Sequence, residues 1–197
     1  MRLKIVNVGE PALRVTSHEL TKEQILSPAI QNLIEYMRET LRDAPGVGLA
    51  APQVGESLQL AVIEDKTEYH KVFTAAELNE RGRSEVPFHV IVNPVIELVT
   101  ESSITFFEGC LSLPGFTALV PRADKVRVRC LDHRGEPRII DASGWYARIL
   151  QHETDHLRGA LYIDRMLTHS FSTLENYTRH WKNLPLKDAA ENNSLSH

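Results

Sequence analysis

Apolar residues recur at helical spacing after residue 27. Ser27 is a typical N-cap residue. Pro28 suits the first helical position, because the backbone N–H that proline lacks would have no intrahelical acceptor there. Pro45 and Gly46 mark the end of this segment. The pattern therefore predicts a helix with one buried stripe, made of Ile30, Leu33, Ile34, Met37 and Leu41.

Several shorter segments carry the patterns of β-strands. Residues 58–64 form one predicted strand, and the β-branched stretch 89–99 around Asn93 and Pro94 predicts two short strands or one interrupted strand. Apolar positions alternate over 126–131, and residues 138–141 follow after a turn, which predicts a hairpin. The charged stretch 66–86 between them has little periodicity, so we expect a surface insertion or long loop there.

A second helix is predicted over 145–157, capped by residues 142–144. Four of its side chains share one face, because they fall at i, i+4, i+7 and i+11: Trp145, Ile149, His152 and His156. A last helix is expected over 174–181, followed by a disordered polar tail over 187–197. These elements predict an α+β fold in which short antiparallel strands pack around a central metal-binding helix. We place its domain at residues 1–168 and a C-terminal helix with its tail at 169–197.

Composition narrows the class of protein. A chain of 197 residues is long enough for one domain with a substantial core. The net charge of -4 gives no electrostatic reason to expect nucleic-acid or membrane binding, and no apolar run approaches the roughly 18 residues of a membrane span. The first residues lack the apolar stretch of a signal peptide. Two cysteines in a chain of this length favour a reducing compartment over a disulfide scaffold.

The strongest chemical signal is His152-Glu153-Thr154-Asp155-His156. Histidines at i and i+4 lie one turn apart on a helix, so both rings can bind one metal ion. The glutamate between them can reach a metal-bound water as a general base. The alternative is a solvated helix face that matches this pattern by accident. The predicted helix is apolar, however, and burying histidines there without a metal or another partner would cost free energy.

A catalytic site of this type needs a third protein ligand. In a long zincin signature that position would hold a histidine, and here it holds Tyr162. A thermolysin-like peptidase would use a downstream glutamate, for which Glu175 is suitably placed. Cys110 is the third candidate, in a glycine-rich loop where the backbone can approach a metal closely. Cys130 falls in a strand pattern and is expected to be a small core residue. A non-catalytic structural metal site would need four protein ligands, and without Cys130 no fourth ligand is evident.

Three ordered motifs resemble those of the peptide deformylases: residues 46–53 (GVGLAAPQ), 108–112 (EGCLS) and 151–156 (QHETDH). The resemblance covers roughly residues 5–168. The segment 143–148 before the third motif resembles the branch that includes organellar-type enzymes.

The resemblance implies a role for each matching position. Three residues would bind the metal with a water in the fourth place: Cys110, His152 and His156. Glu153 would act as general base and then acid while this water attacks the formyl carbon, and the Gln53 amide and Leu111 N–H would stabilise the oxyanion. The substrate would contact Val47, Gly48, Glu108, Gly109, Trp145 and Ile149.

The resemblance also implies the cofactor and the partners. The family typically works with Fe(II), and a sulfur and nitrogen ligand set also accepts Zn(II), Ni(II) or Co(II). The substrates would be N-formylmethionyl nascent polypeptides, with transient ribosome contact and no nucleic-acid specificity. The expected location is the bacterial cytoplasm, or a mitochondrion or plastid if a transit peptide has been removed.

Overall fold

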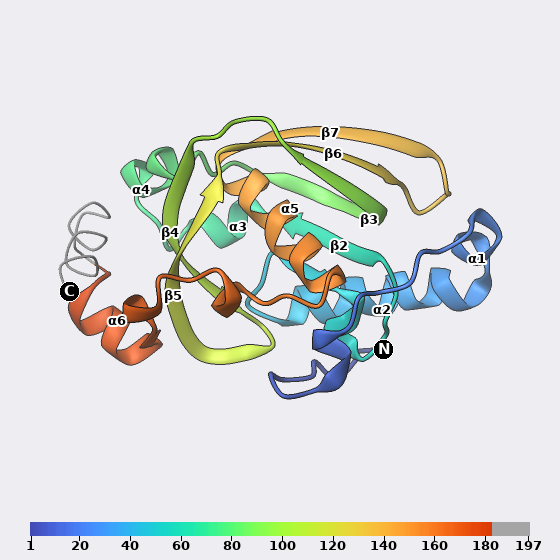
Figure 1. The fold of residues 1–197 in the computed structure, drawn as a ribbon, viewed down its shortest axis with the longest axis horizontal. Helices are drawn as coiled ribbons and strands as arrows, with labels where there is room; N and C mark the ends of the chain where they lie inside the picture. Colours follow the sequence, from blue (N-terminus) through green and yellow to red (C-terminus); the bar gives the residue numbers. More distant parts are fainter. Residues whose placement is uncertain (183–197) are drawn as a thin grey trace.

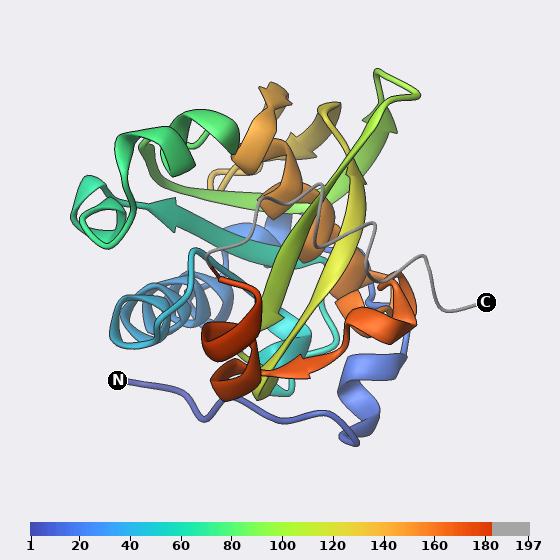
Figure 2. The same cartoon turned by 90° about the vertical axis from the view of Figure 1, so that its left-hand side faces the viewer.

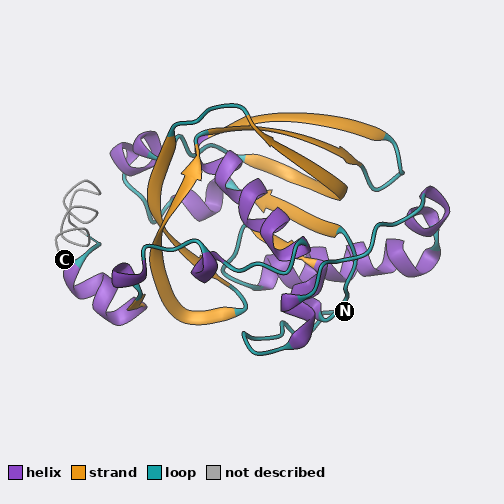
Figure 3. Cartoon of the chain, viewed as in Figure 1, coloured by secondary structure: helices purple, strands orange, loops and turns teal. Residues whose placement is uncertain are grey.

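The computed structural model describes residues 1–182. A central helix, α5 (Gly144–Leu157), lies between two antiparallel sheets, with the five-stranded sheet on one side and the β4–β5 ribbon on the other (Figures 1 and 3). The predicted α+β fold with antiparallel strands around a central helix is confirmed.

The five-stranded sheet has the order β1-β2-β3-β6-β7. Its β3 strand is interrupted as predicted, because the register shifts between Val92 and Val95, where Asn93 adopts a φ of 50°. The predicted hairpin is also present, as β6 paired with β7. The strands of this sheet are β1 (Gly48–Ala50), β2 (Leu60–Asp65), β3 (Val86–Leu98), β6 (Lys125–Leu131) and β7 (Pro137–Ser143).

The smaller sheet has the order β4-β5-β8, and only its end near residue 110 carried a signal in the sequence. The chain forms two strands on either side of Leu111 and Ser112, where we expected a glycine-rich loop. Proline and glycine within this stretch interrupt the alternating apolar pattern that would have predicted strands. The strands are β4 (Ser103–Cys110), β5 (Leu113–Ala123) and β8 (Ser172–Thr173).

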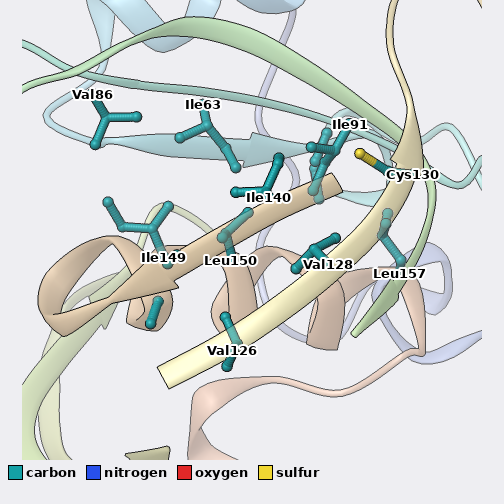
Figure 4. Packing of buried hydrophobic residues seen from close by; sticks show 14 residues of the cluster. Ile63, Val86, Ile91, Val126, Val128, Cys130, Ile140, Ile149, Leu150 and Leu157 are labelled. Carbon is teal, nitrogen blue, oxygen red and sulfur yellow. The ribbon is translucent and has the colours of Figure 1, made fainter. Parts of the chain in front are cut away.

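The apolar face of α5 anchors the helix on the large sheet. Ile149, Leu150 and Leu157 are buried against Val128 and Ile140 of the β6–β7 hairpin (Figure 4). Burying side chains of this size contributes about 1.5–3 kcal/mol each. This packing fixes the helix so that the side that carries the two histidines faces the β4–β5 hairpin.

The remaining helices cover the sheet edges and the N-terminal side. In the long helix α2, Ser27 Oγ accepts a hydrogen bond from Ile30 N at 3.4 Å, so the predicted N-cap is confirmed. The helices and 3-10 turns are η1 (Pro11–Arg14), α1 (Lys22–Leu26), α2 (Pro28–Asp43), η2 (Ala51–Val54), α3 (Thr67–His70), α4 (Ala75–Glu80), η3 (Tyr162–Asp164), η4 (Thr168–Ser170) and α6 (Leu174–His180).

The structure corrects the interpretation of residues 66–86. This segment holds α3 and α4 instead of an irregular loop, and Thr74 caps α4 through a reciprocal pair of hydrogen bonds with Glu77. The end of this segment also determines which residue can begin α5. Gly144 has a φ of 58°, and a Cβ there would lie 2.8 Å from the Gly82 carbonyl oxygen, so a glycine starts the helix. Ser143 takes the N-cap position within the predicted capping residues, but its side chain makes no capping hydrogen bond within residues 1–182.

Two further expectations concern the chain as a whole. Within residues 1–182, every helix is too short or too polar to span a lipid bilayer. The predicted C-terminal helix is confirmed as α6, whereas the tail over 187–197 lies outside the described residues. The division of the chain at residue 168 stays a prediction.

Candidate metal centre

The structure brings Cys110 together with the two histidines of α5. The ligating atoms of Cys110, His152 and His156 all lie within 4.8 Å of one another, and Cys110 Sγ is 3.3 Å from His156 Nε2. Cys110 is the last residue of β4, so the turn into β5 presents its sulfur to the helix. A thiolate and two imidazoles are ligands that divalent transition metals accept, and three protein ligands leave an open position.

The other two candidate ligands lie elsewhere. Glu175 is on the exposed surface of α6 and pairs with Arg179 at 3.1 Å. Cys130 is a residue of β6 and is buried in the core, where burial raises the pKa of its thiol to about 11. Within residues 1–182 the group is therefore a three-ligand site that uses Cys110.

Glu108 orients one of the two imidazoles. Its Oε2 accepts a hydrogen bond from His152 Nδ1 at 3.0 Å, which leaves Nε2 as the nitrogen available to a metal. Burial alone would raise the pKa of Glu108, but hydrogen bonds from His152 and Arg122 outweigh it and hold the pKa well below its usual range. For His152 the effect of burial has the opposite sign, because burial lowers the pKa of an imidazole. Its contacts with Cys110 and Glu108 outweigh burial and raise the pKa of His152 well above the usual value. The groups around this ring therefore favour positive charge.

A buried ion-pair network supports Glu108 from behind, and the sequence interpretation missed it. Arg122 binds both Glu108 oxygens at 2.9 Å and reaches Asp155 at 2.5 Å, while Arg148 contacts Glu108 Oε1 at 2.6 Å. Arg165 completes the network on Asp155. One signal was available, because Arg148 is a single charge inside an apolar helical stretch, where a buried charge requires a partner.

Gln53 lies directly beside the sulfur. It is buried, its Oε1 accepts a hydrogen bond from Ala50 N at 2.9 Å, and its Nε2 donates to Ser112 Oγ at 3.2 Å. The same Nε2 is 3.5 Å from Cys110 Sγ. Turn η2 therefore holds this amide next to the candidate ligand.

An apolar cleft of about 620 Å³ opens onto this group. Of the residues that the sequence assigned to the site, only His156 does not line the cleft; it is buried behind the others, with 1% of its surface exposed. The predicted residues that line it are Val47, Gly48, Gln53, Glu108, Gly109, Cys110, Leu111, Trp145, Ile149, His152 and Glu153.

Other lining residues carried no signal for the site in the sequence. Arg83 reaches the cleft from the end of the α3–α4 segment, where buried Asp65 holds its guanidinium through two hydrogen bonds of 2.8 and 2.9 Å. Its Cζ lies 5.4 Å from the centre of the Trp145 ring, so Trp145 is both a cleft wall and a packed side chain. Phe116 and Leu174 also line the cleft.

Glu153 is a buried acid on the cleft wall. Burial raises its pKa to about 7, and its Oε2 has no hydrogen-bond partner within residues 1–182. Gly48 lies against it so closely that a Cβ at residue 48 would be 2.2 Å from Glu153 Oε1. An unpaired buried carboxyl group is costly unless it meets a water or a substrate, and a pKa near neutrality suits proton transfer.

These observations fit a catalytic metal ion. The donor set contains one sulfur and two nitrogens, a carboxylate holds one ring in the tautomer that ligates through Nε2, and the free carboxyl of Glu153 lines the same cleft.

The comparisons with known proteins agree with this geometry. The sequence model of the polypeptide deformylase family matches residues 2–171. The chain belongs to this family. The resemblance in the three motifs is thereby confirmed.

Relatives occur in bacteria and in organelles. The chain is 46% identical over 172 residues to the chloroplastic peptide deformylase 1A of Solanum lycopersicum, covering 87% of this chain and 62% of the relative. It is 45% identical over 179 residues to peptide deformylase 3 of Streptomyces avermitilis, covering 91% and 78%. The chain thus spans less than two thirds of the tomato protein, and 64% of a chloroplastic and mitochondrial relative from Arabidopsis thaliana.

Solved deformylase structures share the fold. A class I type b peptide deformylase from Acinetobacter baumannii, bound to Met-Ala-Ser, superposes with a TM-score of 0.74 at 30% identity, covering 84% of this chain and 99% of the other. An Ehrlichia chaffeensis peptide deformylase in complex with actinonin gives a TM-score of 0.71 at 33% identity, covering 84% and 88%.

Proposed function

We propose that this deformylase family member is a metal-dependent hydrolase that removes the N-terminal formyl group from formylmethionyl polypeptides and releases formate. The observation that carries the proposal is the grouping of Cys110, His152 and His156 beside Glu153 on the wall of an apolar cleft. Relatives named peptide deformylases support it, as do solved relatives bound to Met-Ala-Ser and to actinonin.

Cys110, His152 and His156 would hold the metal. A bound divalent ion supplies a Lewis acid and lowers the pKa of water toward ~7. The ligand set accepts Fe(II), Zn(II), Ni(II) or Co(II), and we infer Fe(II) as the native ion from the family resemblance. The neutral form of His156 suits this role, because burial and the neighbouring His152 lower its pKa well below the usual value.

The proton transfers are assigned to Glu153. It takes a proton from the attacking water and delivers it to the leaving amine, so that formate and a free N-terminus result. The Gln53 amide and the Leu111 N–H stabilise the oxygen that becomes negative in the transition state. Gln53 supports this assignment by its position, since its Nε2 lies next to the sulfur of Cys110.

The cleft walls suit an extended peptide with an apolar first residue. Backbone groups of residues 47–48 on one wall and 109–111 on the other would pair with the substrate as strands do. The methionine side chain would enter the apolar end formed by Val47, Trp145 and Ile149. Glu108 lines this end, but its carboxylate is occupied by Arg122, Arg148 and His152, so it acts through His152.

The partners and compartment follow from the substrate. Formylmethionyl chains arise where translation begins with formylmethionine, so we infer nascent chains as partners, with transient ribosome contact. The bacterial cytoplasm, a mitochondrion or a plastid would supply them. Bacterial, chloroplastic and mitochondrial proteins are among the similar sequences, including a human mitochondrial deformylase that is 36% identical over 170 residues.

The test of this function is selectivity for formyl over acetyl. We expect formyl-Met-Ala-Ser to release formate at least about 10²-fold faster than acetyl-Met-Ala-Ser releases acetate, because an added methyl group displaces the carbonyl carbon from its reacting position. Mass spectrometry of the products would also distinguish a peptidase. Comparable acetyl hydrolysis, or cleavage at the internal peptide bonds, would contradict the proposal.

Substitution of Gly48 by alanine tests the placement of Glu153. The new methyl group would overlap Glu153 Oε1 and displace the carboxyl from the cleft wall, so kcat/KM should fall about 10²-fold while the bound metal is retained. The control is the same change in a Glu153→Ala background, where the clash is absent. A further loss of similar size in that background would show that Gly48 acts independently of Glu153.

A further inference from the structure

The C-terminal segment beyond the family match forms part of the cleft. The match to the family ends at residue 171, whereas β8 and α6 occupy residues 172–180. The β8 strand pairs with β5, with Phe116 opposite Thr173 and Thr117 opposite Ser172. Figure 2 shows α6 beside the ends of β4 and β5. The segment therefore extends the small sheet at the mouth of the cleft.

Aromatic packing fixes α6 in this position. The Tyr177 ring lies 4.6 Å from the ring of Phe107, which itself lines the cleft, and Trp181 packs against the same cluster. Thr173 caps the helix by accepting a hydrogen bond from Asn176 N at 3.2 Å. These contacts make the position of Leu174, the first residue of α6, a fixed feature of the rim.

Three apolar side chains at this rim remain exposed. Phe116 and Phe171 stack with centroids 5.1 Å apart and planes inclined by 5°. Phe116, Phe171 and Leu174 are 37%, 43% and 48% exposed. Phe116 and Leu174 also line the cleft that contains the candidate metal ligands Cys110 and His152. An exposed apolar patch that joins a binding cleft is typical of a ligand contact.

We propose that the rim patch of Phe116, Phe171 and Leu174 binds an apolar side chain downstream of the formylmethionine, at the second or third residue of the substrate. This inference rests on the proposed function. A peptide whose first side chain enters the apolar end near Trp145 extends past residues 109–111 toward Phe116 of β5. The next side chains then reach the rim that β5 and α6 share. Leu174 is the specificity-determining residue that the C-terminal segment contributes.

The experiment compares phenylalanine with serine at each downstream position. For the wild type, kcat/KM should favour formyl-Met-Phe-Ser or formyl-Met-Ala-Phe over formyl-Met-Ala-Ser by about fivefold, mostly through KM, since the rim buries apolar surface without touching the reacting atoms. Leu174→Ser should reduce this ratio to about one. Leu167→Ser is the matched control, because Leu167 is also an exposed leucine, at 37%, shortly before this segment, but lies outside the cleft lining. It should keep the wild-type ratio.

Binding of the unformylated products separates this inference from the proposed function. Quenching of tryptophan fluorescence, with Trp145 in the cleft wall, reports the affinity of Met-Ala-Phe, Met-Phe-Ser and Met-Ala-Ser without any turnover. Tighter binding of a phenylalanine peptide that Leu174→Ser abolishes supports the rim subsite even if formate release fails. Equal affinities for the wild type, or a preference that Leu174→Ser leaves intact, would overturn it.

Discussion

The Cys110→Ala variant is expected to lose its divalent metal and its deformylase activity together. Cys110 brings the only sulfur in the group of three ligating atoms, and two histidines on one helix are left without the third ligand that a catalytic site requires. We expect substoichiometric metal by elemental analysis and no measurable formate release above background. Native Cys110 should resist alkylation until a chelator removes the ion, because only the free thiolate reacts readily.

Cys130→Ala is the matched control. Cys130 is buried in the core with its thiol protonated, since burial raises the pKa to about 11. This variant should keep full metal and turnover and lose only some thermal stability from the removed atoms. If Cys110→Ala retained stoichiometric metal, or if Cys130→Ala lost it, the ligand assignment would be wrong.

Replacing Glu153 with alanine or glutamine should lower kcat/KM by about 10²–10⁴-fold, the range for a general acid–base group. The metal should remain bound, because Glu153 lies on the cleft wall and is not among the three grouped ligand atoms. Its carboxyl is buried with one oxygen unpaired, so Glu153→Gln should leave the thermal unfolding temperature unchanged or raise it.

The combination of these measurements separates a catalytic role from a structural one. A lower unfolding temperature together with metal loss would mean that Glu153 supports the site and does not transfer protons. Near-normal turnover by Glu153→Gln would exclude it as the base, since the amide cannot accept the proton of water. Retained metal, retained stability and lost turnover would together support the assignment.

The supporting ion-pair network explains why the ligands hold their positions. Arg122 and Arg148 neutralise Glu108 in the buried interior, and Glu108 in turn fixes the tautomer of His152. Removing one member of such a network leaves a buried charge without its partner, which commonly costs 3–5 kcal/mol. The network therefore couples the geometry of the site to the stability of the fold around it.

Local patterns in the sequence were sufficient for several elements. The capped helix from Pro28, the helix that carries the histidines, the interrupted strand around Asn93 and the hairpin before α5 all follow from spacing and capping within short windows. The histidine pair was predicted for the same reason, since i and i+4 positions are neighbours in any helix. The resemblance in three motifs added the family.

The third ligand and the shape of the cleft depended on long-range contacts. Spacing alone left Cys110 and Glu175 as alternatives, and only the fold brings the end of β4 to α5 while leaving Glu175 on the surface. The partners of Glu108, the contact of Gly48 with Glu153 and the rim that Leu174 completes also join residues far apart in the chain. The sequence by itself thus determined several of the elements and the chemical groups of the site, because these depend on neighbouring residues. The tertiary structure decided which groups meet, because packing of α5 between two sheets sets their distances.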